Sequence, residues 1–300
     1  MKQAMGDSQY ISEVRKLLAR LQSPDCQQAR QQAAELIVAT VRAGGLCHLF
    51  DSGHMLTHEL VGRAGGLMLF NPVEIELKLA QNSPARRAPV APAAKPASTC
   101  ASASAAEDAR QAAGVVTSTA ATSTAAATST AMPAPTRARP PRVHLDEIAG
   151  LAEFVFSQAH WEAGDVLVIG SVSGVSRLVV EMARLAREAG IHVIALTSVR
   201  ASQALPSAHP SGLRLYEVAE IVLDHGAPPQ DAVLSRPGLE TPICPVSGLL
   251  AAATMWALTE EVVRQMQAAG LTPSVLASNH LPGAAEFNAR MRARFQQLGY

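Results

Sequence analysis

Residues 164–190 read GDVLVIGSVSGVSRLVVEMARLAREAG. The apolar run Val166–Ile169 is typical of a buried strand. From Leu178 to Ala189, apolar residues recur three and four positions apart, which predicts a helix that ends at Gly190. A second apolar run, Ile191–Leu196, follows directly. The stretch therefore predicts a strand, a loop, a helix and another strand, the unit from which parallel sheets are built.

The loop of this unit, residues 170–176, contains only Gly, Ser and Val. It lies between the end of a strand and the start of a helix, where unpaired backbone N–H groups and the helix dipole favour an anion. Ser171, Ser173 and Ser176 add hydroxyl donors, and Gly174 allows a ligand to approach the backbone. The loop lacks the Lys of a P-loop and the G-x-G-x-x-G pattern, so it suits a small phosphate ester better than a nucleoside triphosphate. Ser and Gly are also good turn and capping residues, and that alternative stays open.

The N-terminal part of the chain repeats this organisation. Leu46–Phe50 reads as a strand, residues 51–54 as a loop and Met55–Ala64 as a helix. Two glycines follow, and Leu67–Phe70 reads as a second strand. Ser52 and Gly53 of this loop correspond to the Ser and Gly residues of the central loop.

The remaining periodic segments complete an α/β pattern. The expected helices are Ile11–Leu21, Gln27–Ala43, Leu145–Val155, Pro245–Ala269 and Ala284–Leu298, the fifth strand is Ile221–Asp224, and residues 225–241 read as irregular. Five strands with interleaved helices predict a three-layer, flavodoxin-like fold with a parallel sheet in the order 2-1-3-4-5 and helices on both faces. In that order, the loops at residues 51–54 and 171–176 meet at the point where ligands bind to such sheets.

Residues 82–142 differ in composition from the rest of the chain, because they consist mainly of Ala, Ser, Thr and Pro. Such a segment has too few large apolar residues to offset the entropy of ordering. We therefore expect a disordered insertion within a single domain over residues 1–300.

Composition excludes several classes of function. The formal net charge is zero, so we expect no nucleic-acid partner. The N-terminus lacks the apolar stretch of a signal peptide, and no apolar run is long enough to span a bilayer. We expect a soluble, cytoplasmic protein with no membrane association. The four cysteines form no C-x-x-C motif. His54 and His58 lie four positions apart without a clear third ligand, so we expect no metal and no cofactor.

The central loop and its flanks resemble the sugar isomerase (SIS) domain, whose loop pattern S-x-S-G-x-[ST] is matched by Ser171, Ser173, Gly174 and Ser176. The segments VIALTS and HPSGLRLYEVAEIVLD are similar to a single-domain bacterial branch of that family, as is a terminal motif formed by Ser278, Asn279, Gly283 and Asn288. The resemblance implies a phosphosugar at the strand ends, bound by the three loop serines with Thr197 and Ser198 nearby. It also implies a homodimer, which the apolarity of Pro245–Ala269 supports.

The leading hypothesis for function is an aldose–ketose isomerase of sugar phosphates. That reaction needs a base to move a proton between adjacent carbons through an enediolate. Glu59 and Glu286 are the candidate bases, and His54 and His209 are candidates for ring opening. Both glutamates lie near helix starts, where a carboxylate also serves simply to complement the dipole. The alternatives are a non-catalytic sugar-phosphate sensor and a lyase or etherase of an amino-sugar phosphate.

Overall fold

The computed structural model describes residues 8–52, 55–75 and 144–300. The predicted insertion at residues 82–142 lies outside the described residues, and so do Gly53 and His54. Of Met55, only the backbone is described.

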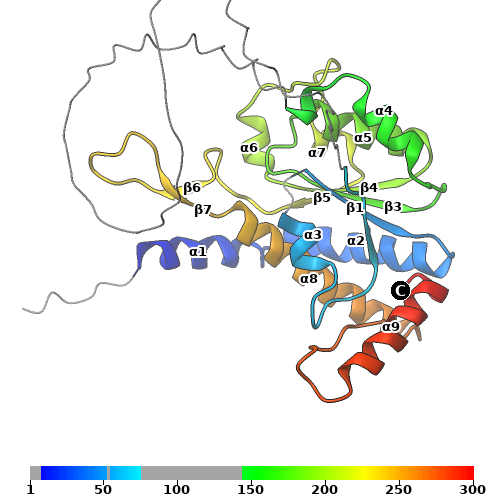
Figure 1. Ribbon diagram of the computed structural model, residues 1–300. Coiled ribbons are helices and arrows are strands. Elements are labelled where there is room, and N and C mark those ends of the chain that lie inside the picture. Colours follow the sequence, from blue (N-terminus) through cyan, green and yellow to red (C-terminus); the bar gives the residue numbers. More distant parts are fainter. Residues whose placement is uncertain (1–7, 53–54, 76–143) are drawn as a thin grey trace, which may run out of the picture. The chain divides into compact units, whose positions relative to one another are not determined.

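The fold is built on a five-stranded parallel sheet in the order β2-β1-β3-β4-β5 (Figure 1). The strands are β1 Cys47–Asp51, β2 Phe70–Pro72, β3 Val166–Gly170, β4 His192–Thr197 and β5 Ile221–Asp224. Asp51 pairs with Gly170, and Gly170 pairs with Leu196, so β1, β3 and β4 end almost level at one edge of the sheet. The predicted fold class and strand order are confirmed.

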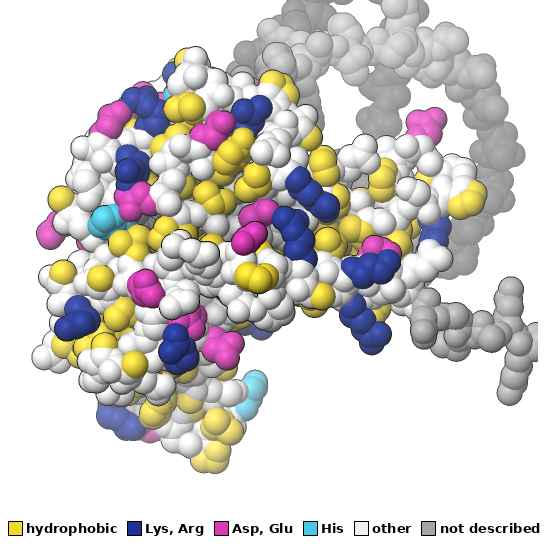
Figure 2. Space-filling model, turned by 180° about the vertical axis from the view of Figure 1, so that it is seen from behind, with side chains coloured by type: hydrophobic (Ala, Val, Ile, Leu, Met, Phe, Trp, Pro, Cys, Tyr) yellow, Lys and Arg dark blue, Asp and Glu magenta, His cyan; other side chains and the backbone are white. Residues whose placement is uncertain are grey.

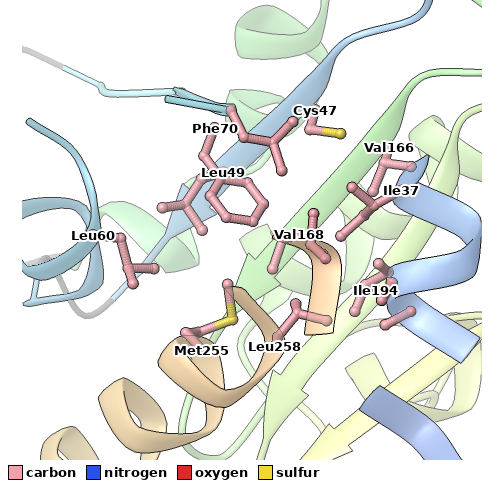
Figure 3. Packing of buried hydrophobic residues seen from close by; sticks show 14 of the residues in the cluster. Ile37, Cys47, Leu49, Leu60, Phe70, Val166, Val168, Ile194, Met255 and Leu258 are labelled. Carbon is pink, nitrogen blue, oxygen red and sulfur yellow. The ribbon is translucent and has the colours of Figure 1, made fainter. Parts of the chain in front are cut away.

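Helices cover both faces of the sheet, because alternate residues of each strand point to opposite sides. Val166 and Val168 of β3 belong to one core, whereas Leu167 and Ile169 belong to the other. Helices α2 Pro24–Arg42, α3 Met55–Leu60 and α8 Ser247–Ala268 cover the first face (Figures 1 and 3). Helices α4 Leu151–Gln158, α5 Arg177–Glu188 and the short α7 Leu215–Val218 cover the second.

The apolarity of α8 is explained within one chain. Leu250, Met255, Leu258, Val262 and Met266 repeat at helical spacing, and each is completely buried. Four of them pack in the core between the sheet, α2 and α3. The apolarity of this helix therefore gives no support to a homodimer, since the chain's own elements bury these five side chains.

The second strand was expected at Leu67–Phe70, but β2 begins at Phe70. Leu67 instead forms an antiparallel bridge with Val275. The N–H groups of Gly65 and Met68 donate to the carbonyls of Leu276 and Ser274. This contact with the C-terminal part of the chain occupies the backbone that the apolar pattern assigns to a strand.

Glycines shorten two predicted helices. Helix α3 ends at Leu60, before Gly62 at φ 76°. The expected helix Leu145–Val155 is interrupted at Gly150, which has φ 82°, so that a 3₁₀ turn at Leu145–Glu147 precedes α4. Gly adopts such left-handed conformations without strain, and a helix cannot continue through them.

A two-stranded antiparallel hairpin, β6 Ala232–Leu234 and β7 Ile243–Pro245, lies in and beyond the segment that was expected to be irregular. It also takes up Pro245, the expected first residue of the following helix. Asp231 joins the hairpin to α8, because its Oδ1 accepts hydrogen bonds from the N–H groups of Val246 and Ser247 at 3.0 and 2.7 Å. This carboxylate thus complements the positive end of the helix.

The terminal motif has a structural role. Asn288 lies on α9 Ala284–Leu298 and is only 2% exposed. Its side-chain amide donates to the carbonyl of Ala277 at 3.0 Å and accepts from the same residue's N–H at 2.8 Å. It also donates to Asn279 Oδ1 at 3.0 Å. These bonds fix the segment before α9 against the helix.

Asn288→Ala is expected to lower the free energy of unfolding by about 2 kcal/mol, because buried backbone groups of Ala277 lose their partners. Urea unfolding measures the change. The exposed Gln296→Ala on the same helix is the control and should stay within about 0.5 kcal/mol of the unaltered protein. Equal losses in the two variants would contradict the role assigned to Asn288.

The other helices are α1 Gln9–Arg20 and α6 Val199–Gln203. On the face shown in Figure 2, basic and acidic side chains of the described residues are interspersed, with no large patch of one sign. No helix within residues 8–52, 55–75 and 144–300 has both the length and the apolarity needed to cross a membrane.

Candidate functional site

The loop at residues 171–176 connects β3 to α5 at the edge where β1, β3 and β4 end (Figure 1). Three of its carbonyl groups accept hydrogen bonds from backbone N–H groups of residues that follow β4. Val172 accepts from the N–H of Ser198 at 3.0 Å, Gly174 from that of Leu215 at 2.8 Å, and Val175 from that of Ala208 at 2.9 Å. The loop is thus held from one side.

These carbonyls determine where the N–H groups of the loop point. In a planar trans peptide, the C=O and the next N–H point in opposite directions. The N–H groups of Ser173, Val175 and Ser176 therefore point away from the segments that hold the loop. Within the described part of the chain, none of the three has a hydrogen-bond acceptor. Such a set of neighbouring N–H groups at a helix N-terminus is an anion-binding arrangement.

The loop hydroxyls divide into two kinds. Ser171 Oγ accepts from the N–H of Gly174 at 3.2 Å and so stabilises the turn. Ser173 and Ser176 are partly exposed, and neither hydroxyl has a partner among the described residues. Ser176 is the N-cap residue of α5 but makes no capping bond, whereas Ser23 caps α2 and Ser198 caps α6 through their hydroxyls. Two donors are therefore left at the start of α5.

Two glycines lie in close contact with neighbouring side chains here. Gly174 has φ 59°, and a Cβ on it would lie 3.0 Å from Leu215 Cβ and 3.1 Å from Thr197 Oγ1. Gly170 lies so close to the β1 side that a Cβ would come within 2.7 Å of Leu56 Cδ1. A side chain at Gly174 would be strained by the positive φ as well as crowded, whereas one at Gly170 would require the end of the Leu56 side chain to move.

The loop after β1 lies beside this site. The N–H and the Oγ of Ser52 both donate to the carbonyl of Gly170, at 3.0 and 3.1 Å. Asp51 Oδ2 accepts from the N–H of Leu56 at 2.7 Å and so caps α3. The structure thus places Ser52 next to Ser171, as expected from the strand order.

Thr197 and Ser198 lie behind the loop and are completely buried. Thr197 Oγ1 donates to the carbonyl of Val172 at 3.1 Å, and Ser198 Oγ donates to that of Ala227 at 2.6 Å. Both hydroxyls therefore hold backbone, and the donors without partners in the described residues are those of Ser173, Val175 and Ser176.

His209 lies in the segment that bonds to the loop at Val175. Its Nε2 contacts Glu181 Oε2 of α5, and its Nδ1 lies 2.7 Å from Ser211 Oγ and accepts from the Ser211 N–H at 3.1 Å. The side chain is 5% exposed. Both ring nitrogens have partners within the protein, so the structure gives His209 a bracing position.

The two candidate bases lie elsewhere. Glu59 forms an ion pair with Arg63 and accepts from Trp256 Nε1 of α8 at 3.3 Å. Glu286 is exposed in the first turn of α9, which lies beyond α8 on the side of the sheet away from α5 (Figure 1). Neither carboxylate is brought to the loop of its own chain. In the described residues, no group of three or more His, Cys, Asp or Glu side chains is arranged to hold a metal ion.

Sequence reasoning named His209 as a candidate but missed its partner Glu181 and the bond from the segment at residues 206–213 to the loop. Glu181 falls on the polar face of the predicted helix, and its partner His209 lies 28 positions further along the chain. No local pattern signals a contact over that separation.

Comparisons with known proteins identify the family of this chain. A family model described as the SIS domain matches residues 9–92 and 98–198. A UPF0309 protein of Streptomyces griseus is 40% identical over 152 residues, which span 51% of this chain and 61% of that protein. A UPF0309 protein of Shouchella clausii is 26% identical over 97% of this chain and 98% of its own length. The solved structure of phosphoheptose isomerase GmhA from Neisseria gonorrhoeae is 15% identical over 85% of this chain and 95% of that chain, with a TM-score of 0.41. Because the family model matches more than half of the residues and includes the loop before α5, this chain belongs to the SIS domain family.

Proposed function

We propose that the loop at residues 171–176 binds the phosphate group of a sugar phosphate. The observation that carries this proposal is the set of three N–H groups, of Ser173, Val175 and Ser176, that lack acceptors among the described residues and whose peptide carbonyls all bond to residues after β4. The hydroxyls of Ser173 and Ser176 supply two more donors. The first turn of α5 contains no acidic residue and begins with Arg177, so no carboxylate of the helix repels an anion there.

We propose that the bound sugar phosphate undergoes aldose–ketose isomerisation. An isomerase needs one group that removes a proton from a carbon and returns it to its neighbour. Of the candidates, Glu59 and His209 are held by partners within the chain. The base in this proposal is therefore His54 of the neighbouring loop or Glu286 of a second copy of the chain.

The second candidate function is a sugar-phosphate-binding module without turnover. One observation favours it: the described residues place donors, but no carboxylate or imidazole without a partner, beside the loop. NMR of the sugar phosphate that binds best separates the two functions. Exchange of the C1 or C2 proton with solvent supports the isomerase, and unchanged spectra at saturating protein support the binding module.

A panel of sugar phosphates in a thermal-shift assay tests the binding site. A ligand at a hundred times its Kd should stabilise the fold by about 2.7 kcal/mol and raise Tm. Ser173→Ala is expected to weaken that ligand by about tenfold to a hundredfold, because a hydrogen bond to a charged group is lost. Ser157→Ala on α4 removes a hydroxyl that bonds only within its helix and should bind normally. If no sugar phosphate shifts Tm, the loop does not bind phosphate.

We also propose that residues 1–300 form one SIS domain with an insertion at residues 82–142, and that the protein is a cytoplasmic homodimer. The isomerase proposal with Glu286 as the base needs this dimer, because Glu286 of one chain would then act at the loop of the other. Light scattering across a range of concentrations measures the mass, and a single mass of one chain contradicts the dimer.

A further inference from the structure

Four side chains form a series of contacts, three of them on α5 and the fourth, His209, in the segment after α6. Glu181 lies one turn beyond the start of the helix, and its side chain is 15% exposed. Its carboxylate contacts His209 Nε2 and accepts from Arg184 at 3.3 Å. Arg184 also bonds to Glu188 at 2.6 Å. Glu181 is thus the only one of the two carboxylates paired with Arg184 that also contacts His209 in the described residues.

His209 links this carboxylate to the segment at residues 206–213. The backbone N–H of His209 donates to Ser207 Oγ at 3.1 Å, and the ring Nδ1 accepts from the backbone N–H of Ser211. Ser207 Oγ in turn donates to the carbonyl of Leu213 at 2.6 Å. The imidazole therefore fills the inside of a closed turn, and Glu181 anchors that turn on α5.

The same turn holds the anion loop. The N–H of Ala208, next to His209, donates to the carbonyl of Val175 at 2.9 Å. That carbonyl shares a peptide unit with the N–H of Ser176, one of the three unpaired donors. The position of Ala208 consequently sets the direction in which the Ser176 N–H points.

The charge on Glu181 is stabilised in this setting. Burial alone would raise the pKa of its carboxyl group. The hydrogen bond from His209 and the charge of Arg184 outweigh burial, and the pKa is lowered. The group is thus an ionised acceptor for the Nε2–H of His209 near neutral pH.

We propose that Glu181 is a positioning residue for the anion loop: through His209 it holds Ala208 against Val175 and so directs the Ser176 N–H toward the bound phosphate. This inference rests on the proposed function, since it assigns a residue to the same site. Glu181 does not touch the ligand, and its effect is transmitted through the turn at residues 206–213.

The test compares three variants by NMR, without ligand and with inorganic phosphate. Glu181→Ala removes the anchor, and exchange of the Ala208 amide with solvent should become about 10- to 100-fold faster. Its phosphate affinity, read from the shifts of the Val175 and Ser176 amides, should fall severalfold. Glu181→Gln keeps an oxygen that accepts from His209 Nε2–H and should restore both readouts to within about threefold. Glu188→Ala is the matched control, because it removes the other carboxylate that bonds to Arg184 and should change neither readout.

A double variant guards against a general loss of stability. If Glu181 acts through His209, then Glu181→Ala combined with His209→Ala should exchange at Ala208 no faster than either single variant. Unchanged exchange in Glu181→Ala overturns the inference, and so does an equal effect of Glu188→Ala or no rescue by Glu181→Gln. If phosphate shifts no amide of the unaltered protein, the proposed function fails, whereas exchange at Ala208, measured without ligand, still decides whether Glu181 holds the turn.

Discussion

Replacing Asp165 by alanine is expected to lower the free energy of unfolding by about 4 kcal/mol. This carboxylate lies directly before β3, and the residue is 3% exposed. Its Oδ1 accepts from the N–H of Leu46 at 2.8 Å, and its Oδ2 accepts from that of Glu162 at 3.0 Å. Oδ2 also lies 3.2 Å from His48 Nε2. Alanine leaves the N–H groups of Leu46 and Glu162 and the buried ring of His48 without this acceptor, and the loss of three partners at one carboxylate is costly.

Guanidinium unfolding measures this loss. Asp165→Asn keeps the shape and one acceptor oxygen, so we expect it to lose about half as much. Glu240→Ala removes an exposed carboxylate of the chain and should change stability by less than about 0.5 kcal/mol. If Asp165→Ala behaves like Glu240→Ala, the carboxylate does not join β1 to β3 in the way described.

Acidification from pH 7.5 to pH 4.5 is expected to remove about 2.5 kcal/mol of stability through His225 alone. His225 follows β5 and is 2% exposed, and its Nδ1 accepts from the N–H of Ala227 at 3.3 Å. Burial lowers the pKa of this imidazole to about 4, although the charges of Asp224 and Asp231 act in the opposite direction. Between pH 6.5 and pH 4 the unfolded chain therefore binds a proton that the folded chain does not, so stability is complete above pH 6.5 and is lost as the pH falls.

Other groups also titrate in this range, so the measurement is a difference between variants. His225→Gln cannot gain the proton, and its unfolding free energy should fall by about 2.5 kcal/mol less than that of the unaltered protein over the same interval. His160→Gln, at an exposed position, should follow the unaltered protein. Parallel curves for His225→Gln and the unaltered protein would refute a neutral buried imidazole at this position.

The sequence predicts the sheet where local pattern and long-range pairing agree. The apolar runs around Val168 and Ile194 are short, lie between turn residues and are buried on both sides, as a central parallel strand must be. The run Leu67–Phe70 is equally apolar, yet its first residue pairs with Val275. The two paired residues are more than two hundred positions apart in the sequence. The periodicity of a short window therefore carries no information about their pairing.

The candidate site, too, is predictable from the sequence only in part. Residues 171–176 are recognisable because small residues between a strand and a helix are unusual outside anion loops and turns. The directions of their N–H groups are set by Ala208, Leu215 and Ser198, which approach from behind only in the folded chain. A histidine in a loop near the site, such as His209, is a candidate for acid–base chemistry from the sequence alone. Its partner Glu181 becomes visible only when α5 and the segment after α6 are placed together.

The position of β1 between β2 and β3 has a consequence for how the chain folds. The contact between Leu46 and Asp165 spans 119 residues. In the unfolded chain, closing a loop of that length costs about 1.2 kcal/mol more entropy than closing one of about 30 residues. Pairing of distant parallel strands is correspondingly slow. Until β1 arrives, β3 has an open edge at which a strand of another molecule can add. Refolding yield should therefore decline as protein concentration rises, because capture by a second molecule competes with the arrival of β1.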